Sequence, residues 1–178
     1  MPSSHLSLVN QKLAYASSII DLLSEPLADL HSAQRLERQA LGDAAVFHLV
    51  MALHFYLREL AEHHYLKNLS AIHSVEDLLA ALLQVEKVSS ESSELLLLTQ
   101  TAGTWLNQLL GYYDQLSKSP EKRKEKKSFG QDNLIELVEL SGDVEGQSAL
   151  KLTSELLLLW LNSFRLLIAR QRETSAEY

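Results

Sequence analysis

Residues 46–60, Val-Phe-His-Leu-Val-Met-Ala-Leu-His-Phe-Tyr-Leu-Arg-Glu-Leu, carry the clearest structural pattern in this chain. At about 100° per residue, most of the aliphatic side chains of this stretch fall on one broad helical face. The residues on that face are Val46, Leu49, Val50, Leu53, Leu57 and Leu60. Phe47 and Met51 widen the face on one flank, and Tyr56 widens it on the other. A helix that is apolar on so many sides is expected in the middle of a bundle or against a partner chain.

Apolar residues at three- and four-residue spacing continue on both sides of this stretch and predict five helices. We expect them at residues 4–24, 26–65, 74–87, 93–117 and 145–172. Gly42 and Asp43 are the weak point of the second helix, since glycine costs up to ~1 kcal/mol in a helix interior, and we expect a kink or a break there. Ser74 followed by Asp77 resembles a capping box and marks the start of the third helix.

The composition changes sharply between the fourth and fifth predicted helices. Six of the ten residues 118–127 are basic and two are acidic. Such a run predicts a flexible, solvated linker, which we extend to residues 118–133. Residues 134–140 are too few to distinguish an extended crossing from a single helical turn. We therefore predict an all-α fold, a single domain over residues 1–178, built as an antiparallel bundle of about five helices with one basic linker before the last helix.

The composition excludes several classes of protein. The chain has 178 residues, 46% of them apolar, and no cysteine, so disulfides and thiolate chemistry are excluded. The absence of cysteine and of a signal peptide favours a cytoplasmic protein, and no stretch has the ~20 apolar residues of a membrane span. A net charge of −7 makes nucleic acid an unlikely partner. The glycine-rich loops that hold nucleotides are also missing, and we expect no cofactor.

The seven histidines raise the question of a metal site. Glu59 and His63 are four residues apart on one helix, and His48 lies on the same face. A di-iron bundle, however, needs Glu-x-x-His motifs on two helices, and the chain contains none. We therefore predict no metal site.

Arg58, His63 and His64 are the only catalytic candidates. Their spacing fits the Arg-x(4–6)-His pattern of helical nucleotide-binding domains, some of which cleave RNA by stabilising charge with arginine and moving protons with histidine. A chain of this composition would contain roughly 0.8 such matches by chance. Glu59 directly after the arginine would also repel a phosphate. The alternative is a purely structural role, in which Arg58 flanks the bundle and the two histidines end a helix.

Four aromatic residues at helical spacing are a candidate lining for a small-ligand pocket between helices. They are Trp105, Tyr112, Tyr113 and Trp160. Aromatic residues in this pattern more often belong to the core.

Several short segments together resemble a known family. They are Asn-Gln-Lys-Leu at residues 10–13, Phe-His-Leu at residues 47–49, Arg-Gln-Arg-Glu at residues 170–173 and the closing Glu-Tyr at residues 177–178. In these the chain resembles a small family of uncharacterised helical proteins from Pseudomonas and related marine gammaproteobacteria. The resemblance implies an all-α fold and a cytoplasmic, bacterial setting, and it carries over no catalytic residue.

Two functional hypotheses follow from the sequence. The first is a non-enzymatic interaction or scaffold protein that binds a protein partner or itself, because the helix around residues 46–60 and the leucine-rich last helix offer so much apolar surface. The alternative is an Arg-x(4–6)-His nucleotide-binding or RNA-cleaving domain that uses Arg58, His63 and His64.

Overall fold

A computed structural model describes residues 4–25, 31–118 and 151–176 of the chain. These residues form helices and no strand, so the predicted all-α fold is confirmed. The helices are α1 (His5–Ser24), α2 (Ser32–His63), α3 (Val75–Gln84), α4 (Ser90–Gln100), α5 (Trp105–Ser117) and α6 (Ser154–Ala176), with a short 3₁₀ helix, η1 (Leu69–Ala71), between α2 and α3.

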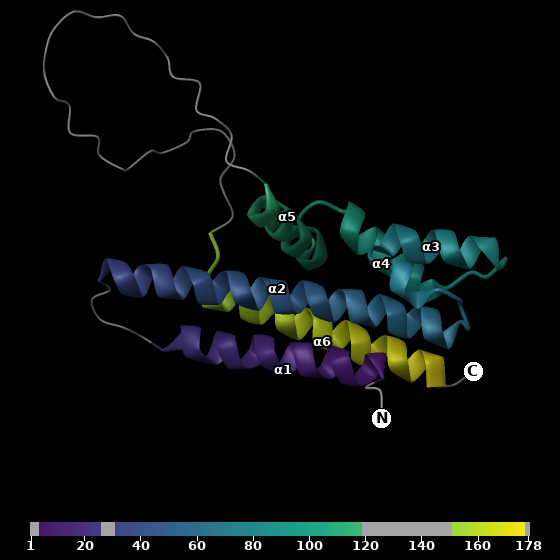
Figure 1. The fold of residues 1–178 in the computed structure, drawn as a ribbon, viewed down its shortest axis with the longest axis horizontal. Helices are drawn as coiled ribbons and strands as arrows, with labels where there is room; N and C mark the ends of the chain where they lie inside the picture. The colour runs from purple at the N-terminus through teal and green to yellow at the C-terminus, as the bar shows by residue number, and fades with distance from the viewer. Residues whose placement is uncertain (1–3, 26–30, 119–150, 177–178) are drawn as a thin grey trace, which may run out of the picture.

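The helices form two groups on either side of α2 (Figure 1). The long helices α1, α2 and α6 lie side by side, and the shorter α3, α4 and α5 lie on the other side of α2. α1 runs antiparallel to α2, since His5 at the start of α1 is hydrogen-bonded to Glu62 near the end of α2 (3.0 Å). α6 runs parallel to α2, since Tyr56 in the second half of α2 bonds to Gln171 in the last turns of α6. The predicted antiparallel arrangement therefore holds for α1 but not for the α2–α6 pair.

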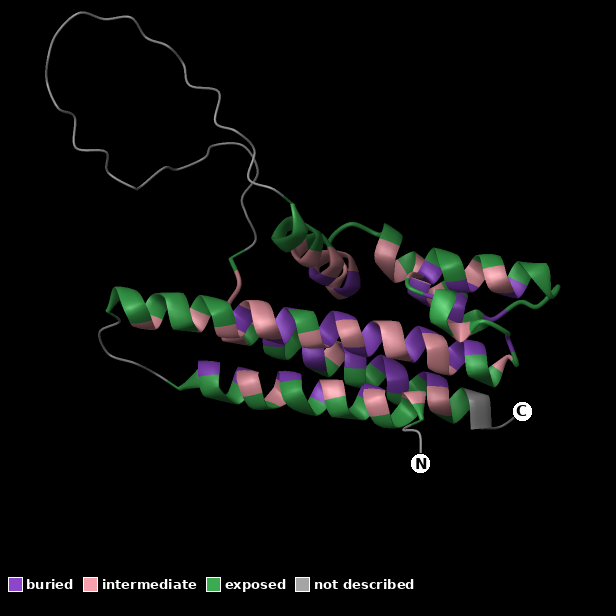
Figure 2. Ribbon diagram, in the orientation of Figure 1, coloured by how far each residue is buried: buried purple, intermediate pink, exposed green. Residues whose placement is uncertain are grey.

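The centre of the bundle is the second half of α2, as the stretch 46–60 predicted (Figure 2). All six aliphatic residues of the predicted face are buried, and Tyr56 is buried with them. Among the helices described, α2 alone is long and apolar enough by length and composition to cross a membrane, and 50% of its apolar window is buried against other helices. Burial on several sides accounts for this composition, because α2 contacts α1, α3, α5 and α6.

Gly42 neither breaks nor ends α2, contrary to the sequence prediction. The helix continues through Gly42, and the missing side chain leaves room there for a close neighbour. A Cβ atom added at Gly42 would lie 2.9 Å from Cδ2 of Leu152, which is closer than real Cβ atoms approach. Gly42 thus allows the chain that enters α6 to pack directly on α2.

The fourth predicted helix is two helices, so the described residues form six α-helices where five were predicted. α4 ends at Gln100, and α5 begins at Trp105 after a short turn. Gly103 in that turn has a φ of +84°, a backbone conformation that favours glycine. Thr104 then caps α5 by accepting a hydrogen bond from the backbone N–H of Asn107 (3.3 Å).

The starts of α1 and α3 agree with the prediction, and both are capped by side chains, whereas the capped start of α4 at Ser90 lies three residues before the predicted one. Ser4 caps α1, and Ser74 and Asp77 form the predicted capping box at α3. α6 begins at Ser154 rather than near residue 145, since residues 151–153 are not helical. The predicted start of the second helix at Pro26, residues 134–140 and the predicted basic linker, apart from Lys118, lie outside the described residues.

Candidate functional site

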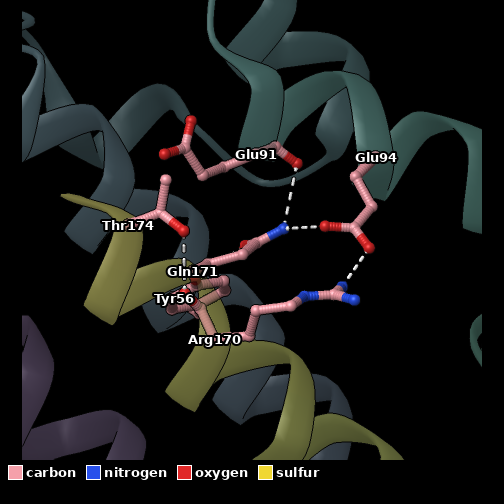
Figure 3. Close-up of polar contacts among 6 residues, drawn as sticks. All are labelled: Tyr56, Glu91, Glu94, Arg170, Gln171 and Thr174. Atoms are coloured by element: carbon pink, nitrogen blue, oxygen red, sulfur yellow. Dashed lines mark hydrogen bonds and ion pairs between the residues drawn. The ribbon is translucent and has the colours of Figure 1, made fainter.

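A buried polar network joins the last turns of α6 to α2 and α4 (Figure 3). Gln171 is its centre and is only 3% exposed. Its Oε1 accepts a hydrogen bond from the Tyr56 hydroxyl (2.7 Å), and its Nε2 donates to Oε2 of Glu94 (2.8 Å). Arg170 forms an ion pair with the other oxygen of Glu94. Gln171 therefore fixes the angular position of α6 against two neighbouring helices at once.

Arg172, the residue after Gln171, bonds to another residue of α2 and to α1. Its Nε and Nη2 donate to the two carboxylate oxygens of Glu59, both at 2.8 Å, and its Nη1 donates to Oδ1 of Asn10 in α1 (3.4 Å). A paired, two-pronged contact of this kind is the strong form of an arginine–carboxylate bond. The negative charge of Glu59 was an argument against a phosphate site when only the sequence was considered. In the structure its carboxylate connects α2 to α6.

The residues of this network were not predicted as site residues. They carry part of the family-like segments, since Asn10 belongs to residues 10–13 and Arg170, Gln171 and Arg172 belong to residues 170–173. A polar Arg-Gln-Arg run on a helix with a leucine-rich interior was the available signal. Its partners are more than 70 residues away in the chain, which spacing along one helix does not reveal.

The network has the electrostatics of a structural contact. Burial, and next the charge of Glu59, raise the pKa of Tyr56 above its ordinary range. The hydroxyl therefore stays protonated and remains a donor to Gln171. The acidic and basic groups are already paired with each other, as Arg172 is with Glu59 and Arg170 with Glu94.

Arg58 is held by backbone rather than by the two histidines of the sequence hypothesis. Its Nε donates to the carbonyl of Ile72 (3.1 Å), and its Nη2 lies 3.3 Å from Nδ1 of His73. The guanidinium also lies over the ring of Phe55, 5.8 Å from its centre. Arg58 thereby ties the segment that enters α3 to the side of α2.

His63 and His64 pack against each other at the end of α2, with ring centres 5.6 Å apart. The structure shows no hydrogen bond or ring contact between Arg58 and either of them. Burial, and next the neighbouring His63, lower the pKa of His64. Its Nε2 is buried and has no hydrogen bond to the described residues.

Two other histidines lie closer to Arg58 than the predicted ones. His54 is one turn before Arg58 on α2, and His73 contacts its guanidinium. Burial, then Arg58, then His73 lower the pKa of His54. The predicted trio of Arg58, His63 and His64 is therefore split, and its arginine belongs to a different cluster.

The described residues contain no group of three or more histidine or carboxylate side chains that could hold a metal ion. The four aromatic candidates are also separate from one another in their contacts. Trp160 is fully buried and donates to Gln108 (3.4 Å), and Trp105 packs on Phe164 (5.5 Å between ring centres). Tyr112 donates to Asp43 (3.1 Å).

Tyr112 lines a cavity in the described part of the chain, and the other three aromatic candidates do not line it. This cavity has a volume of about 460 Å³ and lies between the end of α1, the start of α2, α5 and the start of α6. Arg35, Arg38 and Gln39 give it one polar wall, and leucines with Gly42 give it an apolar one. Arg38 is already used to cap α1, because it donates to the carbonyls of Leu23 and Glu25.

The outward face of α6 carries three exposed leucines. Leu158, Leu159 and Leu166 are 43%, 55% and 72% exposed, and we call these three residues the α6 ridge. The inward face of the same helix is complete without them, because Leu157, Trp160, Leu161 and Phe164 are all buried. The α6 ridge therefore adds nothing to the core of the bundle.

Comparisons with known proteins give one match. No curated protein and no solved structure matches the chain. One family model, described as a family of unknown function (DUF6586), matches residues 1–178. Because the match spans the whole length, the chain belongs to this family of unknown function.

Proposed function

We propose that this protein is a non-enzymatic helical interaction or scaffold protein of the cytoplasm that binds a protein partner through the α6 ridge. The observation that supports the proposal is the exposure of three leucines on one face of a helix whose other face is fully packed. Burying one leucine side chain completely stabilises a complex by about 1.5–3 kcal/mol. The exposed parts of Leu158, Leu159 and Leu166 together thus offer several kcal/mol to a partner.

The polar network around Gln171 also supports the proposal. Arg170, Gln171 and Arg172 connect α6 to α1, α2 and α4 near the end of the helix. These contacts hold α6 in one orientation, so the α6 ridge is presented on a rigid element. A binding surface on a rigid helix loses less conformational freedom when a partner docks.

The RNA-cleaving alternative has less support. A charge-stabilising arginine must be free to face the reacting phosphate, close to the histidine that moves the proton. Arg58 is instead bonded to the Ile72 carbonyl, and it contacts His73 rather than His63 or His64. The net charge of −7 would further oppose the approach of RNA.

A capture experiment with a matched control tests the proposal. The tagged full-length protein, its Leu166→Glu variant and its Leu36→Glu variant are each incubated with an extract of the organism that encodes the chain. Leu36 lies on α2 and is 69% exposed, against 72% for Leu166, so the two substitutions add the same charge at equally exposed leucines. We expect bound protein, including untagged copies of the chain, to be lost with Leu166→Glu and kept with Leu36→Glu. Equal capture by all three proteins would refute the proposal.

A further inference from the structure

Two of the three leucines of the α6 ridge lie symmetrically about Asn162, whereas the third, Leu159, has Arg165 at its symmetric position. Leu158 lies four residues before Asn162, and Leu166 lies four residues after it. Residues at this spacing form one continuous row along a helix surface. Because the row has a leucine at each end and an amide in the middle, it looks the same when the helix is turned end to end. Such a surface can pair with a copy of itself across a two-fold axis.

An antiparallel pairing about Asn162 would bring each leucine to a suitable partner. Leu158 of one copy would lie at the level of Leu166 of the other, so the two apolar ends of the row meet twice.

Asn162 would lie on the axis itself. It is exposed, and its side-chain amide makes no hydrogen bond to the described residues. A primary amide both donates and accepts, so two Asn162 side chains can bond to each other across a two-fold axis. A single polar asparagine in an apolar helix seam is a known way of fixing the register and the number of helices.

The charges at the two ends of α6 favour the antiparallel direction. Glu155 lies seven residues before Asn162, and Arg170 lies eight residues after it. In an antiparallel pair, Glu155 of one copy is therefore at almost the same level as Arg170 of the other, whose guanidinium also pairs with Glu94 of its own chain. A parallel pair would instead place Glu155 beside Glu155 and Arg165 beside Arg165, which like-charge repulsion disfavours.

From these three features we infer that the partner of the α6 ridge is a second copy of this chain, docked antiparallel with its two-fold axis at Asn162. This inference rests on the proposed function, since it names the partner of the same surface. The pairing leaves the cavity beside Arg35 and the cluster around Arg58 outside the interface.

The first test is the mass of the full-length protein in solution by sedimentation equilibrium. We expect the wild-type chain to reach about 40 kDa, twice the 20.0 kDa of one chain. Leu166→Glu should raise the dissociation constant of the dimer by at least roughly 100-fold, because each dimer loses two leucine contacts. Leu36→Glu should leave it unchanged. Leu158→Glu is a second variant at the other end of the row and should act as Leu166→Glu does.

The second test fixes the direction of the pair and uses the absence of native cysteine. Asn162→Cys should form a disulfide-linked dimer on mild oxidation, since both sulfur atoms would lie near the axis. Glu155→Cys should not, because the two substituted positions would be about 21 Å apart at a rise of about 1.5 Å per residue. Equal crosslinking of the two variants would indicate a parallel pair and overturn the inference.

The two proposals fail in different ways. A wild-type chain that stays at 20.0 kDa overturns self-association, and so does a dimer that Leu166→Glu leaves intact. The interaction function survives either result if capture of another protein still depends on Leu166 and not on Leu36. Both proposals are lost if neither the mass nor the capture depends on Leu166.

Discussion

Replacing Gln171 with leucine should show how strongly the buried polar network holds α6 in place. Gln171→Leu keeps most of the side-chain volume but removes the acceptor of the Tyr56 hydroxyl and a donor to Glu94. Tyr56 is fully buried, so its hydroxyl would lose its partner without gaining water. Leaving a buried polar group unsatisfied costs about 1–3 kcal/mol. Together with the lost bond to a carboxylate, we expect a loss of about 2–3 kcal/mol in the free energy of unfolding.

A double-mutant cycle with Tyr56→Phe separates the bond from the rest of the substitution. Tyr56→Phe alone should cost about 1–2 kcal/mol, because it leaves Oε1 of Gln171 without this donor. In the double variant both partners of the bond are gone, so the total should be smaller than the sum of the two single effects by about 1 kcal/mol. Urea unfolding followed by circular dichroism measures all four free energies. The melting temperature of Gln171→Leu should fall by about 4–12 °C for a chain of this length.

The control is Gln11→Leu, the same substitution at an exposed position of α1. It should change the free energy of unfolding by less than about 0.5 kcal/mol. If Gln171→Leu is as mild as this control, or if the two effects in the cycle simply add, the buried network does not hold α6 as the geometry indicates.

Three further predictions follow from single contacts. Gly42→Ala should stabilise the chain by about 1 kcal/mol more in a Leu152→Ala background than in the wild type, because the added Cβ then meets no side chain. The urea midpoints of the wild type, the two single variants and the double variant test this, and an equal effect of Gly42→Ala in both backgrounds would contradict it. Arg172→Met should lower the free energy of unfolding by about 1–3 kcal/mol. Arg172→Lys should recover little of this loss, because lysine lacks the planar pair of N–H donors that binds both oxygens of Glu59. Full recovery with lysine would show that the positive charge alone suffices. Burial and the charges of Arg58 and His73 lower the pKa of His54, so the folded chain binds fewer protons than the unfolded chain below the ordinary pKa of 6.5. Stability should therefore fall from about pH 7 to about pH 5, and His54→Gln should reduce that fall; an unchanged pH dependence of the urea midpoint would refute the assignment.

The sequence was sufficient for the parts of the fold that depend on one helix at a time. The apolar face of residues 46–60 follows from helical periodicity, and each of its six aliphatic residues is buried. The capping box of Ser74 and Asp77 is also local, since both residues lie within one turn. Such features need no knowledge of the neighbouring helices.

The features that depend on neighbours could not be predicted in the same way. The break between α4 and α5 rests on the positive φ of Gly103, and the leucine pattern on both sides of it favoured one continuous helix. Gly42 was expected to weaken α2, whereas its effect is set by Leu152, 110 residues later in the chain. Periodicity shows which side of a helix is buried but not what it packs against.

The candidate sites also depend on contacts between distant segments of the chain. Arg58, His63 and His64 were grouped by their spacing, yet the hydrogen bonds of Arg58 go to Ile72 and His73 beyond the end of the helix. Tyr56 and Gln171 are 115 residues apart, so only the three-dimensional structure brings them together.

The most direct test of the central claim, that the α6 ridge is a binding surface, is a comparison of wild-type, Leu166→Glu and Leu36→Glu chains by sedimentation equilibrium. The account predicts a concentration-dependent dimer for the wild type and for Leu36→Glu, and a monomer of 20.0 kDa for Leu166→Glu. Identical behaviour of the three proteins, all monomeric or all dimeric, would contradict self-association through this surface. If the extract capture is also the same for all three, the α6 ridge is not a binding surface.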